Sequence, residues 1–135
     1  MKITICGTLK FMDKMREIQK NLEELGHTVL MPIWLDNVDY WSKDNTSRVN
    51  AKRSLKLIDE HMDKVKESEA ILVVNMTKGD IKNYIGANTF IEIGFAHYLG
   101  KKIYLLSHLP DQPYIRDELE AINPIILNND LTKIK

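Results

Sequence analysis

Short runs of β-branched and aliphatic residues alternate along the chain with longer stretches in which apolar residues recur every three to four positions. The first run, residues 2–6, ends at Gly7 and predicts a strand. After it, one helical face carries Phe11, Met12, Met15, Ile18, Leu22 and Leu25. Gly26 predicts the end of that helix, and residues 28–31 predict a second strand closed by Pro32.

The rest of the chain repeats this alternation. Residues 33–46 are polar and aromatic without a period, which predicts a long surface loop. Apolar positions from 51 to 65 predict one helix with a charged outer face. Residues 70–76 are almost continuously apolar, as expected of a parallel strand buried on both faces. We then expect a loop at 77–86, a well-buried helix at about 88–99, a strand at 103–106, a helix at 113–121 and a strand at 124–127.

This order of elements predicts a single doubly wound α/β domain over residues 1–135. We expect a five-stranded, mostly parallel sheet with helices on both faces, in the Rossmann or flavodoxin-like class. Open sheets of this kind bind ligands beyond the carboxyl ends of their strands. The loops that follow the first three strands are therefore the places to look for a functional site.

Composition narrows the classes of function. The 135 residues are 44% hydrophobic and 28% charged, which is typical of a globular domain. Lys+Arg and Asp+Glu both total 19, and this balance gives no electrostatic reason to expect polymeric nucleic acid or a membrane as partner. With one cysteine, Cys6, and no apolar run of signal or membrane-span length, we expect a cytoplasmic protein. The histidines other than His61 show no metal-ligand spacing with one another or with Cys6; they are His27, His97 and His108. We therefore expect no metal and no cofactor.

The loop after the first strand holds Gly7, Thr8 and Lys10. A glycine there lets the backbone approach a ligand, the helix start offers N–H groups to an anion, and Lys10 adds a positive charge. The alternative is a plain strand-to-helix turn with Thr8 as its cap. Cys6, at the strand end, is expected to be a core residue and not a nucleophile.

The segment at residues 83–96 carries the most specific pattern. It places Glu92 in the first turn of a helix at the edge of the sheet, where the helix dipole favours an ionised nucleophile. The alternative is a capping box in which Thr89 caps the helix and Glu92 only satisfies a backbone N–H. Asn88 and Thr89 are candidates either to bind a sugar or phosphate or to cap the helix, and Gly86 permits close approach of a ligand.

This segment, with its Gly-x-x-x-x-x-Glu-x-Gly-x-Ala arrangement followed by Leu-Gly-Lys-Lys-Ile, resembles the signature of the nucleoside 2-deoxyribosyltransferase-like family. That family includes the deoxynucleoside 5′-monophosphate N-glycosidases. The resemblance implies that Glu92 attacks the anomeric carbon and forms a covalent glycosyl-enzyme, which a second base or water then resolves. It also implies that Gly7 and Thr8 lie against the sugar or its 5′ substituent.

Two departures from the family pattern alter this expectation. Gly86 stands where the transferases carry an aspartate and the monophosphate hydrolases a serine, which removes a charge that would repel a phosphate. The family aspartate near the leaving base aligns with His61, close to Asp63. Either residue is a candidate acid for the leaving base, although His61 is equally compatible with an ordinary surface position.

The resemblance predicts cleavage or transfer of the N-glycosidic bond of a nucleoside or nucleoside 5′-monophosphate, in a homodimer or larger homo-oligomer. A nucleotide-binding sensor without turnover is the alternative, and the missing aspartates favour it. Trp34, Tyr40 and Trp41 are candidates to stack on a base or, alternatively, to pack their loop against the domain.

Overall fold

The computed structural model describes residues 1–135 and contains one parallel sheet of five strands. Their order across the sheet is β2-β1-β3-β4-β5, and every neighbouring pair is parallel. The strands span β1 Lys2–Cys6, β2 Thr28–Leu30, β3 Ala70–Val73, β4 Lys102–Leu105 and β5 Ile125–Ile126. This is the flavodoxin-like order, in which the chain reverses direction across the sheet between β1 and β3. The predicted fold class is therefore confirmed.

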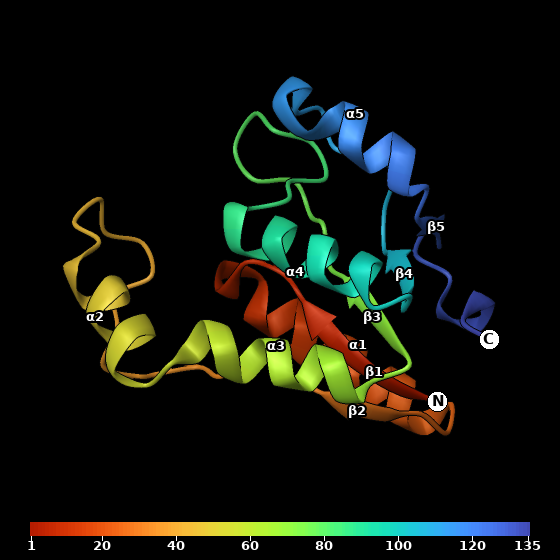
Figure 1. Ribbon diagram of the computed structural model, residues 1–135, viewed down its shortest axis with the longest axis horizontal. Helices are drawn as coiled ribbons and strands as arrows, with labels where there is room; N and C mark the ends of the chain where they lie inside the picture. The colour runs from red at the N-terminus through yellow and green to blue at the C-terminus, as the bar shows by residue number, and fades with distance from the viewer.

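Five α-helices join the strands and cover both faces of the sheet (Figure 1). They span α1 Met12–Glu24, α2 Thr46–Ser54, α3 Leu57–Glu67, α4 Ala87–Tyr98 and α5 Pro113–Ile122, with short 3-10 turns at Leu9–Phe11 (η1) and Leu131–Lys133 (η2). Helix α1 lies behind the sheet in this view, whereas α3, α4 and α5 lie on its other face. None of the helices combines the length and apolar character that a membrane span requires.

Two hydrophobic cores reflect this layering. Alternate side chains of β1 and β3 point to opposite faces, as the two-residue period of a strand dictates. Ile3 and Ile5 pack with α1 in one core, whereas Cys6 packs with α3 and α4 in the other. The thiol of Cys6 therefore faces the same layer as the helices that carry His61 and Glu92.

Two sequence predictions were wrong in detail. The helix predicted over residues 51–65 is divided into α2 and α3, because Lys56 adopts a left-handed backbone conformation (φ 50°) that a helix cannot continue through. Helix α4 is less buried than its apolar character predicts. Ile91 and Tyr98 are exposed, and a Cβ added at Gly94, on the same side, would meet nothing within 4 Å.

Candidate functional site

A cavity of about 510 Å³ opens at the carboxyl ends of β1 and β3, where the strand order reverses. Its walls come from η1, α2, the long loop after β2, the loop after β3 and the start of α4. The volume lies within the range of about 300–1,000 Å³ typical of small-molecule sites. The position is the one that the topology predicts for a ligand.

The six residues predicted to bind substrate all line this cavity. They come from two segments far apart in the sequence: Gly7, Thr8, Lys10, Gly86, Asn88 and Thr89. A Cβ at Gly7 would lie 3.2 Å from the backbone oxygen of Val74 and 3.3 Å from Sδ of Met15. Such contacts are tight, so the absence of a side chain lets β1 turn closely past β3 and leaves the cavity floor open.

The start of α4 differs from both capping interpretations. Gly86 is the N-cap and Ala87 the first helical residue, so neither Asn88 nor Thr89 caps the helix. No side chain caps the start of α4, and the residues of its first turn, 87–89, line the cavity. Because the helix begins before Asn88, Glu92 lies in the second turn and the first turn holds no acidic residue. The expected dipole effect on Glu92 is correspondingly weaker, and the predicted capping box is absent.

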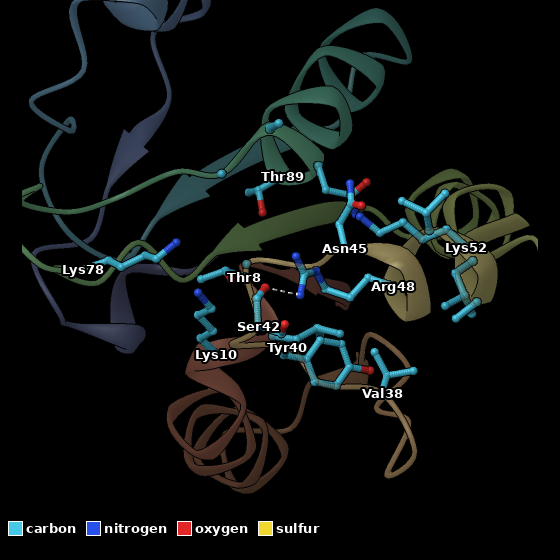
Figure 2. A pocket seen from close by; sticks show the side chains of 18 of the residues that line it. Thr8, Lys10, Val38, Tyr40, Ser42, Asn45, Arg48, Lys52, Lys78 and Thr89 are labelled. Carbon is cyan, nitrogen blue, oxygen red and sulfur yellow. Dashed lines mark hydrogen bonds between the residues drawn. The ribbon is translucent and has the colours of Figure 1, made fainter.

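Sequence reasoning missed most of the positive charge of the cavity. Besides Lys10, the lining includes Arg48 and Lys52 from α2 and Lys78 from the loop after β3, and it contains no aspartate or glutamate. Figure 2 shows Lys10, Arg48 and Lys78 reaching into the same space beneath Thr89. Partial burial, together with the charges of Lys78 and then Arg48, lowers the pKa of Lys10. The cations therefore repel one another in a way that a bound anion would relieve.

The long loop after β2 is held against the cavity by both aromatic packing and hydrogen bonds. Trp34 lies 4.5 Å from Tyr40 between ring centroids, and Trp41 is 6.3 Å from Trp34. The Nη1 of Arg48 donates to the backbone oxygens of Asp39 and Ser42 at 2.9 and 2.7 Å. Among the three aromatic residues, Tyr40 lines the cavity, while Trp34 packs against the α1-side core. Packing of the loop accounts for most of this cluster, and Tyr40 is its one contact with the cavity.

Behind the cavity wall, three side chains from different elements meet. His61 on α3 places Nε2 2.9 Å from Oε2 of Glu92 on α4, and Sγ of Cys6 lies 3.6 Å from the same Nε2. The His61 and Glu92 residues are 6% and 3% exposed, so His61 is not the surface residue that one alternative predicted. Oε2 of Glu92 nevertheless has no hydrogen-bond partner, because its 2.9 Å contact with Nε2 is close without being aligned as a hydrogen bond. The other ring nitrogen of His61, Nδ1, is buried without a partner as well.

The surroundings of this cluster set its chemistry. Burial, followed by the nearby carboxylate of Glu92, raises the pKa of the Cys6 thiol well above its usual value. The thiol is therefore a weak nucleophile, in line with its predicted core role. Cys6, His61 and Glu92 also have the donor atoms that bind zinc. Asp63, the other candidate acid for the leaving base, is exposed and belongs to neither the cluster nor the cavity lining.

Two members of this cluster, Cys6 and Glu92, are close in sequence to residues that line the cavity. Cys6 directly precedes Gly7, and Glu92 follows Thr89 by one helical turn, yet neither Cys6 nor Glu92 is itself part of the lining. Thr89 lines the cavity at 2% exposure, whereas Glu92, one turn later on the same buried face of α4, does not line it. The arrangement is a positively charged cavity with a buried acid-base pair behind its wall.

Comparisons with known proteins address the fold. A scan of family models finds no match, and no curated protein sequence matches the chain. Among solved structures, a 2-deoxyribosyltransferase from the psychrotolerant bacterium Bacillus psychrosaccharolyticus is 22% identical, with a TM-score of 0.54 over 78% of this chain and 71% of that one. A CMP N-glycosidase from Clostridium botulinum is 21% identical, with a TM-score of 0.54 over 93% and 88%. The chain therefore has the fold of the nucleoside deoxyribosyltransferase-like enzymes, the family that the residues around Glu92 resemble.

Proposed function

We propose that this protein cleaves or transfers the N-glycosidic bond of a nucleoside 5′-monophosphate, with Glu92 as the nucleophile. The observation that carries the proposal is the buried contact between His61 and Glu92, next to a cavity whose charged lining residues are all cations. Two solved structures of the same fold support it, since they are named as a 2-deoxyribosyltransferase and a CMP N-glycosidase, enzymes of N-glycosidic bonds.

The cavity supports a phosphorylated ligand. A phosphate dianion placed near Lys10, Arg48 and Lys78 would offset their mutual repulsion and accept hydrogen bonds from the first N–H groups of α4. Gly86, where the transferases have an aspartate, leaves this end of the cavity without a carboxylate to repel the phosphate. The cations therefore favour the 5′-monophosphate over the free nucleoside.

The chemistry follows from the buried pair. An oxygen of Glu92 forms a bond to the anomeric carbon as the bond to the base nitrogen breaks, and protonated His61 gives its Nε2 proton to the leaving base. Water, or a second base, then displaces Glu92 with overall retention. Because neither His61 nor Glu92 lines the cavity, the proposal requires both side chains to turn toward it when the sugar is bound. It assigns no role to Asp63, which is exposed.

The test compares matched nucleosides and nucleoside 5′-monophosphates, with chromatography to detect free base. We expect base release from at least one monophosphate and much slower release from its nucleoside. Glu92→Gln should lower that rate by at least about 10³-fold without changing the fold, since the amide keeps the volume and loses the nucleophile. Base release by Glu92→Gln at the wild-type rate contradicts the proposal.

A nucleotide sensor of the same fold is the second candidate, and the position of Glu92 outside the cavity lining favours it. The same incubations separate the two. A monophosphate that raises the melting temperature of the protein, with no base released over long incubation, supports the sensor. Lys78→Met serves both cases, because it should weaken binding of the monophosphate and leave any binding of the nucleoside nearly unchanged.

A further inference from the structure

We propose that Cys6, His61 and Glu92 form a binding site for a divalent transition-metal ion of the zinc type, behind the wall of the cavity. The site shares His61 and Glu92 with the proposed glycosidic activity, so a bound ion and that chemistry exclude each other, although neither property requires the other. The expectation of no metal came from the histidines other than His61, which show no metal-ligand spacing with Cys6. The three ligands of this site are 55 and 31 residues apart, from 6 to 61 and from 61 to 92, so no local motif indicates them. The fold brings them together from β1, α3 and α4.

The geometry suits zinc. Bonds of about 2.3 Å to sulfur and 2.0–2.1 Å to nitrogen or oxygen hold the ligand atoms of a tetrahedral site roughly 3.3–3.8 Å apart. Here Sγ and Nε2 are 3.6 Å apart, Nε2 and Oε2 are 2.9 Å apart, and all three ligand atoms lie within 4.8 Å of one another. Widening the His61–Glu92 contact, together with bringing the Cys6 sulfur and a Glu92 oxygen to about 3.6 Å from each other, would place one ion within bonding distance of all three.

The unpaired buried oxygen of Glu92 is a reason to expect a bound metal ion at this cluster. Glu92 Oε2 has no hydrogen-bond partner although the residue is 3% exposed, and a buried unpaired oxygen is costly. A metal bond satisfies that oxygen together with the thiol and the imidazole. The charges also balance, since a divalent cation with one thiolate, one carboxylate and one neutral imidazole has no net charge, which suits a buried position.

Binding is a simple ligand exchange. The S–H bond of Cys6 breaks, its proton passes to solvent, and sulfur, Nε2 and a Glu92 oxygen each form a bond to the ion without any change of oxidation state. Three protein ligands leave a fourth position. Because Gly7 follows Cys6 and Thr89 lies one turn before Glu92, and both line the cavity, the proposal assigns this fourth position to water or a ligand that enters from the cavity. An ion held there occupies Glu92 and blocks its use as a nucleophile.

The test is a titration of the untagged, chelator-treated full chain with Co²⁺ and then Zn²⁺, without substrate. Cys6 is the only cysteine, so a thiolate-to-cobalt charge-transfer band reports on that residue alone. We expect about one Co²⁺ per chain with this band, displaced by Zn²⁺. Cys6→Ser should remove the band and weaken Zn²⁺ binding by about 100-fold or more. His97→Gln, which changes an exposed histidine of α4, should leave both unchanged.

Two results would overturn the proposal: a folded wild-type chain that binds Co²⁺ without the thiolate band, or a Cys6→Ser variant that binds Zn²⁺ as tightly as wild type. X-ray absorption at the zinc edge of the wild-type complex provides a readout that needs no variant, and should show one sulfur among nitrogen and oxygen ligands. A metal that binds as expected to a protein without glycosidic activity would refute only the proposed function. Base release in a protein that binds no metal would refute only this site.

Discussion

The contact between His61 and Glu92 should behave as a coupled pair in the free energy of unfolding. Both side chains are nearly inaccessible, at 8% and 4% exposure, so water cannot compensate either one when its partner is removed. Removing one partner of a buried polar contact leaves the other buried without compensation, which costs about 1–3 kcal/mol and more where the remaining group is charged, whereas replacing both by apolar residues of similar volume is often neutral. We therefore expect His61→Leu to lose about 3 kcal/mol, which is a fall of roughly 10 °C in melting temperature for a domain of this size.

Urea unfolding followed by circular dichroism measures this coupling. His61→Gln is the matched control, because its amide can reach the position of Nε2 and donate to Glu92, and we expect a loss of only about 1 kcal/mol. The double variant His61→Leu with Glu92→Leu should be more stable than the sum of the single effects predicts, by at least about 1.5 kcal/mol. Single and double variants whose effects add within about 0.5 kcal/mol would refute the reasoning, since independent sites behave in that way.

Three further predictions concern the cavity and the backbone around it. Because the pKa of Lys10 is lowered, the affinity of the cavity for a phosphate anion should fall as the pH rises through that pKa, which lies below the value of about 10.4 of a free lysine. Lys78→Met removes a neighbouring charge and should move this fall to higher pH, as measured by calorimetry. Gly7→Ala should lose about 1–3 kcal/mol through its contacts with Val74 and Met15, whereas Gly94→Ala, with open space around it, should gain about 0.5–1 kcal/mol in thermal unfolding. Lys56→Gly should raise the free energy of unfolding by up to about 1 kcal/mol, because glycine adopts φ 50° without strain.

Much of the fold could be predicted because local patterns specify it. The buried strands are short apolar runs, and the period of Met12, Met15, Ile18 and Leu22 defines the inner face of α1. The break between α2 and α3 could not be read in the same way, since Lys56 is neither glycine nor asparagine and gives no signal of a left-handed backbone. The exposure of Ile91 and Tyr98 was equally hidden, because an apolar residue is compatible with the core or with the surface.

The cavity lining was only half predictable, for a related reason. Residues that flank strand ends, such as Gly7 and Gly86, follow from topology alone, because parallel strands bring their carboxyl ends to one edge. Arg48 and Lys52 lie on α2, which follows a 15-residue stretch, 31–45, without regular structure. No local pattern predicts which part of the domain the chain contacts after such a stretch. In the sequence, Arg48 and Lys52 look like the ordinary charged face of a surface helix.

The buried cluster forms only because three separate elements, β1, α3 and α4, each turn one of its side chains toward the same space. The two-residue period of β1 turns Cys6, and not Ile5, toward α3 and α4. The helical period of α3 buries His61 and Val65 four residues apart, and that of α4 buries Thr89, Glu92, Ile93 and Ala96. The sequence predicts which residues each element buries, but it does not predict the angle between α3 and α4. That angle decides whether His61 and Glu92 meet. Once they meet, a thiol, an imidazole and a carboxylate share one water-poor space, in which their polar atoms have only one another or a bound ion as partners.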